Sequence, residues 1–218
     1  MRFHPLLISC AVSAFLCATS AQAGVVLGNL GSTGTGSIGS AGYSFNASLD
    51  NTIAIPFVTG PAAADLSSVV IGLGNNVPGA ATATASLYTD LSGLPGGPLS
   101  WSNSQNMSFG QIGTITFADP TPYSLAANTP YWIVVSPGPY DFNWLEALPN
   151  VAPTVQNASG WSYPVAGAQF TNDGWTAIGS QNSFSVNAAV VPEPATCIMA
   201  LAGLACGSYA MFRRRKRA

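Results

Sequence analysis

The segment between residues 24 and 190 contains no cysteine, histidine, lysine or arginine. The only histidine of the chain is His4, and its four cysteines lie before and after this segment. The segment therefore has no imidazole or amine base for a serine nucleophile, no cysteine nucleophile, and no thiolate or imidazole ligand for zinc. It has no positively charged side chain to neutralise phosphate groups, which excludes nucleic acid as a partner. Without disulfides, apolar burial and the hydrogen bonds of a sheet must hold the fold.

Acidic residues are present but few. Seven of the eight carboxylates of the chain lie between residues 24 and 190, where no cation compensates them. The only glutamate of this body is Glu146, five residues after Asp141, and a carboxylate pair can hydrolyse glycosidic bonds. On a strand these two side chains would point to opposite faces, because their separation is odd. We therefore expect a protein without enzymatic activity and keep a carboxylate-only glycoside hydrolase as the minor alternative.

Carboxylates also bind calcium, which takes oxygen ligands. The body contains no Asp-x-Asp-x-Asp-Gly loop. Asp90 lies in the glycine-rich stretch 90–98 and Asp173 precedes Gly174, so solvated aspartates in turns are the favoured interpretation of both. No metal site and no other cofactor is expected, and a structural calcium ion remains the open alternative.

Apolar residues that alternate between turn signals predict an all-β fold. Ile53, Ile55 and Phe57 alternate in the first of many short runs bounded by Gly, Pro, Asn and Ser. The predicted strands are 51–58, 67–73, 82–89, 99–105, 111–118, 130–136, 140–146, 159–163, 174–178 and 183–190. This pattern favours an antiparallel, jelly-roll-like β-sandwich over residues 43–190. Residues 24–42, rich in Gly, Ser and Thr, are expected to form a loose lead-in.

The first 23 residues have the pattern of a cleaved secretory signal. Arg2 supplies the positive start, residues 6–18 are apolar, and Ala21 and Ala23 occupy the two small-residue positions before Gly24. The apolar run is short for a membrane-spanning helix. This segment predicts export by the secretion translocase and cleavage by signal peptidase.

Three features follow one another after residue 190. Pro192, Glu193 and Pro194 come first, and residues 195–212 are then 18 positions without a charge. At about 1.5 Å of rise per residue such a helix spans roughly 27 Å, close to the thickness of a bilayer core. The basic residues that follow are Arg213, Arg214, Arg215, Lys216 and Arg217. Because such a cluster stays on the cytoplasmic side, we expect one transmembrane helix with a basic stop signal.

This three-part arrangement, from Val191 to Arg217, resembles the PEP-CTERM sorting signal of exported bacterial proteins. The resemblance implies an exosortase as partner, a membrane-embedded cysteine protease or transpeptidase that acts near Pro192-Glu193-Pro194. Such enzymes usually belong to strains that make exopolysaccharide. The implied location is the inner membrane for the precursor, and then the cell surface or the extracellular matrix of a biofilm.

Several short segments of the body occur in a recognisable order. They are 51–57 (NTIAIPF), 66–69 (LSSV), 86–90 (SLYTD), 93–96 (GLPG), 125–135 (LAANTPYWIVV) and 173–175 (DGW). This order resembles the choice-of-anchor R domain, an extracellular β-rich module whose members carry different C-terminal anchors, PEP-CTERM among them. Residues 147–172 fit the pattern poorly. The family has no established biochemical activity, so the resemblance implies a module and not a reaction.

All tryptophans of the chain lie in the body, and Trp132, inside an apolar run, is expected in the core. Aromatic faces beside amides and carboxylates hold sugars in many β-sandwiches. The candidates for sugar contact are Trp144, Trp161, Trp175, Asn143 and Asp173. Core or loop packing is the favoured role of the three tryptophans. We therefore expect a structural or interaction role at the cell surface, with a carbohydrate-binding module for exopolysaccharide as the alternative.

Overall fold

A computed structural model of the chain describes residues 23–30, 44–47, 52–75, 78–138, 142–145, 154–155, 160–164, 167–171, 173–179, 182–191 and 203. All thirteen elements among these residues are β-strands. Residues Ala23–Val190 form one compact unit. No helix in the described part of the chain is long and apolar enough to cross a membrane. The predicted signal segment 1–23 lies outside the described residues except for Ala23, and the predicted helix 195–212 does so except for Gly203. The sorting residues 192–194 and the basic residues 213–217 also lie outside them.

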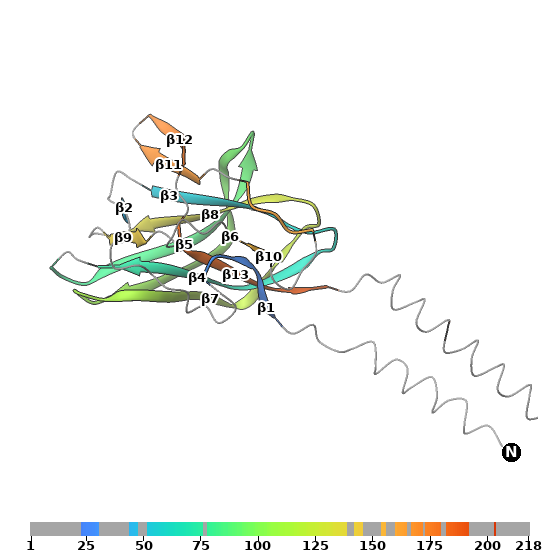
Figure 1. The fold of residues 1–218 in the computed structure, drawn as a ribbon, viewed down its shortest axis with the longest axis horizontal. Coiled ribbons are helices and arrows are strands. Elements are labelled where there is room, and N and C mark those ends of the chain that lie inside the picture. The colour runs from blue at the N-terminus through green and yellow to red at the C-terminus, as the bar shows by residue number, and fades with distance from the viewer. Residues whose placement is uncertain are drawn as a thin grey trace, which may run out of the picture. The chain divides into compact units, whose positions relative to one another are not determined.

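The first sheet contains seven strands, with the order β10-β1-β13-β4-β9-β2 and with β7 paired to β4 (Figure 1). Its strands are β1 (Gly24–Gly28), β2 (Ser44–Ala47), β4 (Ala64–Gly74), β7 (Ile112–Leu125), β9 (Phe142–Leu145), β10 (Thr154–Val155) and β13 (Phe184–Val190). All described pairings are antiparallel. This is one half of the sandwich.

The second sheet contains six strands in the order β12-β11-β3-β8-β5-β6. They are β3 (Thr52–Val58), β5 (Ala81–Leu91), β6 (Leu94–Met107), β8 (Pro130–Pro137), β11 (Gly167–Thr171) and β12 (Gly174–Ile178). These pairings are antiparallel too. The expectation of an all-β chain with two antiparallel sheets is thereby confirmed.

Eight strands form two blocks of four, β1-β13-β4-β7 and β3-β8-β5-β6. The chain crosses between the blocks after β1, β3, β4, β6, β7 and β8, which is the strand order of a jelly roll. The first strand of the body lies beside its last, with Gly24 opposite Ala188. Because β13 pairs with both β1 and β4, the first sheet can be completed only after the last strand of the body has been synthesised.

Side-chain alternation explains why these segments are strands. In β5 the buried residues Ala81, Ala83, Ala85 and Leu87 face inward, and the Thr, Ser and Tyr residues between them face outward. Because successive side chains of a strand point to opposite faces, one strand can cover the core and meet solvent at the same time. The alternation predicted for Ile53, Ile55 and Phe57 in β3 is confirmed, since all three are buried.

The strand prediction differs from the structure in three ways. Residues 24–28 form β1 and not the start of a loose lead-in, because β13 supplies a pairing partner that no local pattern shows. The predicted strand 159–163 is wrong, since its described residues contribute only the bridge between Ser162 and Val58. The short strands β2, β10 and β11 were not predicted. Tertiary pairing therefore adds strands where the sequence has only weak signals.

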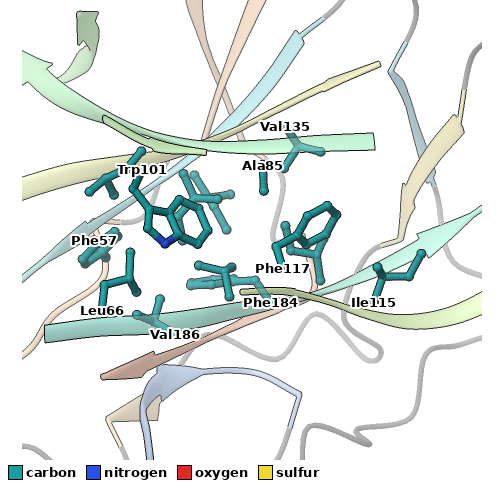
Figure 2. Packing of buried hydrophobic residues seen from close by; sticks show 14 of the residues in the cluster. Phe57, Leu66, Ala85, Trp101, Ile115, Phe117, Val135, Phe184 and Val186 are labelled. Atoms are coloured by element: carbon teal, nitrogen blue, oxygen red, sulfur yellow. The ribbon is translucent and has the colours of Figure 1, made fainter. Parts of the chain in front are cut away.

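A hydrophobic core, here called the inner core, lies between the two sheets (Figure 2). Side chains from the second sheet, such as Phe57 and Trp101, meet Phe117 and Phe184 from the first sheet. All four are at most 1% exposed. At about 25 cal/mol per Å² of apolar surface removed from water, this layer supplies the main stabilising term in a body without disulfides.

Candidate functional site on the outer face of the second sheet

Two of the tryptophans considered for sugar contact lie inside the inner core. Trp144 is 0% exposed, and its Nε1 donates a hydrogen bond of 3.0 Å to the carbonyl oxygen of Ser183. Trp161 is 4% exposed and stacks on Phe57, with 5.8 Å between the ring centroids. Both therefore have the core role that the sequence favoured. Asn143, beside Trp144 on β9, is partly buried. Neither tryptophan therefore offers an open aromatic face to a ligand.

A second, smaller hydrophobic cluster lies on the outer face of the second sheet, the face turned away from the first sheet. Its buried residues are Ala54, Trp132, Val134 and Ala168, and Tyr88, Leu94 and Trp175 pack against them. We call this set the outer cluster. The β11–β12 hairpin contacts the long β6 strand at this cluster (Figure 1). Trp132 is thus buried as expected, but on the outside of the sheet and not between the sheets.

One hydrogen bond ties the outer cluster together. The Nε1 of Trp132 donates to Oδ1 of Asp90 over 2.8 Å, and Oδ2 of the same carboxylate accepts the backbone N–H of Gly93 at 3.1 Å. Gly93 belongs to the two-residue turn between β5 and β6, in which Ser92 and Gly93 both have positive φ. Such a turn matches the twist of a hairpin, and glycine adopts its backbone angles without strain. Asp90 is therefore a structural residue of this hairpin.

The conspicuous sequence block 125–132 has a structural role as well. Asn128 has a φ of 48°, and its N–H donates to the carbonyl of Gly60. The hydroxyl of Thr59 donates to the carbonyl of Ala126 and accepts the N–H of Thr129. These bonds fix the turn between β7 and β8 against the loop after β3. The Asn and Thr of this block therefore define a turn and not a binding site.

Polar side chains in pairs cover the rest of the outer face. Thr84 and Ser104 share a hydrogen bond of 2.8 Å between their hydroxyls, and Ser86 and Ser102 share one of 2.9 Å. In the next pair the hydroxyl of Thr82 donates to the side-chain oxygen of Asn106. These residues come from β5 and β6, whose register places them directly opposite one another. The candidate residues predicted from the sequence do not include this set, although the alternation in 81–86 (ATATAS) carries the signal for it.

An aromatic pair lies at the other end of the same face. Phe170 on β11 and Trp175 on β12 are cross-strand partners, with 5.2 Å between their ring centroids in an edge-on arrangement. Phe170 is 41% exposed, and Trp175 is partly buried against the outer cluster. Of the predicted sugar contacts, Trp175 is thus the one with an accessible ring. Asp173 is exposed in the turn before it, where its N–H donates to the hydroxyl of Thr171.

The described carboxylates do not form a cluster. Within the ranges that the structure describes, no group of three or more His, Cys, Asp or Glu residues comes together. Both oxygens of Asp90 accept hydrogen bonds, while Asp173 is exposed. Asp141 and Glu146, the candidate hydrolytic pair, lie outside the described residues. The expectation of no metal site stays a prediction, with a structural calcium ion at Asp90 or Asp173 as its alternative.

The body is thus an antiparallel β-sandwich whose last strand, β13, is a central strand of the first sheet and ends at Val190. Val191 is exposed, and Pro192 follows directly. Residues 190–216 match the PEP-CTERM protein-sorting motif. This motif marks an exported protein that an exosortase processes at the membrane before surface display. A comparison with curated proteins finds no match.

Proposed function

We propose that the chain is a non-enzymatic protein of the cell surface or extracellular matrix, associated with exopolysaccharide in a biofilm. The secretion translocase exports it, signal peptidase cleaves between Ala23 and Gly24, and the segment 195–217 holds the precursor in the inner membrane. The match of residues 190–216 to the sorting motif is the observation that carries this proposal. The body lacks the histidine or lysine base that activates a serine nucleophile, and it lacks cysteine, which supports a role without catalysis.

The identity of the body belongs to the same proposal. We assign residues 43–190 to a module like the choice-of-anchor R domain. In support, two of the sequence segments that carry the resemblance meet in space, since Asp90 of one accepts the indole N–H of Trp132 of the other. A hydrogen bond between residues 42 positions apart requires that both segments fold together.

Mass spectrometry of the protein from cells and from the medium tests the sorting. We expect a mature form that begins at Gly24 and has lost Arg213–Arg217. Replacement of Pro192, Glu193 and Pro194 by alanine should leave the basic residues attached and the protein in the membrane fraction. Arg2→Lys is the matched control, because it alters the other signal but keeps its charge. Secreted protein that still carries Arg213–Arg217 would count decisively against the proposal.

A carbohydrate-binding module is the second candidate. The observation that favours it is the outer face, where an accessible aromatic pair lies on the same sheet surface as paired hydroxyls. Titration of exopolysaccharide against the protein, followed by tryptophan fluorescence and by thermal stability, tests it. The absence of any change in both signals would remove this candidate.

A further inference from the structure

The outer face presents a continuous row of side chains across all six strands of the second sheet. Thr84 lies opposite Ser104 on one side and Ser136 on the other. Thr52 follows on β3, next to Ile53, which pairs with Val135. The row ends with Phe170 and Trp175, which pair with each other beyond Thr52. With strands about 4.8 Å apart, the part of the row on β3, β8, β5 and β6 spans roughly 14 Å, enough for a short segment of a polymer of rings.

The hydroxyls of this row keep free hydrogen-bonding capacity. A hydroxyl has one donor and two acceptor lone pairs. The bond between Thr84 and Ser104 uses one donor and one lone pair, so the pair retains one donor and three lone pairs. The same holds for Ser86 and Ser102. Such a surface can both donate to and accept from its partner, as sugar hydroxyls also do.

Charge restricts the identity of that partner. The body carries no lysine, arginine or histidine, so no cation is available to pair with a phosphate, sulfate or uronate group. Its seven carboxylates would repel an anionic polymer. The hydroxyls of this face are uncharged, and Asp90, on the same face of β5, already accepts hydrogen bonds from Trp132 and Gly93. The complementary partner is therefore an uncharged polyhydroxyl chain.

We propose that the outer face of the second sheet binds a neutral polysaccharide chain. The chain lies across the hydroxyl platform, defined as Thr52, Thr84, Ser86, Ser102, Ser104 and Ser136, and stacks its apolar ring faces on Phe170 and Trp175. Aromatic rings beside a polar surface bind this class of ligand because they cover the C–H groups of a sugar while the hydroxyls are satisfied nearby. This inference rests on the proposed surface role and names the partner of that role.

A paired variant tests the platform directly. Thr84→Val with Ser104→Ala removes two hydroxyls with little change of volume. The probes are soluble neutral glucans, the neutral fraction of the producing strain's own exopolysaccharide, and alginate as the anionic polymer. With the full-length protein in detergent, we expect calorimetric titration to show binding to a neutral polymer that is about tenfold weaker in the variant, since each net hydrogen bond is worth a factor of roughly 2 to 10. Phe170→Ala should weaken binding by a similar factor.

The matched control lies on the first sheet. Thr116→Val with Ser124→Ala makes the same two replacements at exposed positions of β7, and should leave binding unchanged. Equal loss in both double variants would overturn the proposal, as would equal binding of alginate and neutral polymers. Binding of no neutral polymer would overturn it as well. Self-association of the unliganded protein that disappears only in the Thr84/Ser104 variant would assign this face to a second copy of the chain instead.

The outcome is independent of the sorting experiment. A protein that loses Arg213–Arg217 and reaches the surface, but binds no neutral polysaccharide, would retain the proposed surface role and lose this site. A protein that binds through Thr84 and Ser104, but keeps its basic residues when secreted, would retain the site and lose the proposed sorting route.

Discussion

The two faces of the second sheet differ, and Trp101 and Trp132 show how. Trp101 on β6 points into the inner core, is 1% exposed, and its Nε1 has no hydrogen-bond partner in the described part of the chain. Trp132 on β8 points to the outer face, is 2% exposed, and its Nε1 is held by Asp90. The two indoles are therefore equally buried, but only the one on the outer face has its N–H hydrogen-bonded by a described residue.

The difference shows what each face does. The inner face is mostly apolar, because it must fill the space between two layers. The outer face is apolar only where two hairpins cover it, and elsewhere it presents hydroxyls and an accessible aromatic pair. The inner face accordingly stabilises the fold, and the outer face is the surface that remains for a partner.

The largest expected effect is on the inner side. Phe57→Ala removes a ring that is 0% exposed and lies against Tyr131 and Trp161. We expect the free energy of unfolding to fall by about 3–5 kcal/mol, because a large cavity remains in a packed core. Urea denaturation of the purified protein measures this. A loss below about 1 kcal/mol would show that the inner core does not dominate stability.

An intermediate effect distinguishes the two tryptophans. Trp132→Phe removes the hydrogen bond to Oδ1 of Asp90 and some packing. We expect the free energy of unfolding to fall by roughly 1–3 kcal/mol, because this carboxylate oxygen loses its indole donor. Trp101→Phe loses similar volume but also removes a buried N–H without a partner, so it should destabilise less. Thermal unfolding of both variants compares them. The reverse order would mean that the Asp90 contact contributes little.

The smallest effect concerns Tyr163, which packs against the inner core at Phe184. Its hydroxyl is buried and has no hydrogen-bond partner among the residues that the structure describes. Burial raises the pKa of Tyr163 to about 12 from its ordinary value of 10. Below about pH 10 the phenol is neutral in both the folded and the unfolded state. Between pH 10 and 12 the unfolded form loses its proton first, so stability falls as pH rises.

Tyr163→Phe should therefore be neutral or slightly stabilising at pH 7, since it removes an unpaired buried hydroxyl. Above pH 10 the variant should retain more of its stability than the parent protein. Denaturant midpoints at pH 7, 9 and 11 measure the difference. Parallel curves for the two proteins at all three values would contradict the raised pKa, and a loss at pH 7 would mean that the hydroxyl has a partner.

Sequence patterns predicted the long strands of the fold well. Alternation placed β3, β4, β5 and β8 close to their observed ranges, and β12 at its observed bounds. The same patterns failed for β1, β2, β10 and β11, which are short and pair with strands distant in the chain. For these segments the pairing partner supplies the stabilisation that local propensity lacks.

For the candidate site the sequence was only partly informative. It named Trp175 and Asp173 as candidates for sugar contact but could not rank them above Trp144, because composition and neighbours do not reveal which side of a sheet a residue faces. The register of β5 with β6 brings Thr84 to Ser104, and that of β11 with β12 brings Phe170 to Trp175. These juxtapositions depend on antiparallel pairing, which no short pattern encodes.

The sequence by itself determined the chemistry that is possible: a body without cations, thiols or imidazoles, an all-β pattern, and a sorting motif after the last strand. These follow from residue identity and local spacing, which are properties of the unfolded chain as much as of the folded one. Only the tertiary structure decided that Trp144 and Trp161 are buried and that hydroxyls from β5, β6 and β8 form one surface. The physical reason is that burial and sheet register arise from contacts between distant segments, which exist only once both sheets have formed.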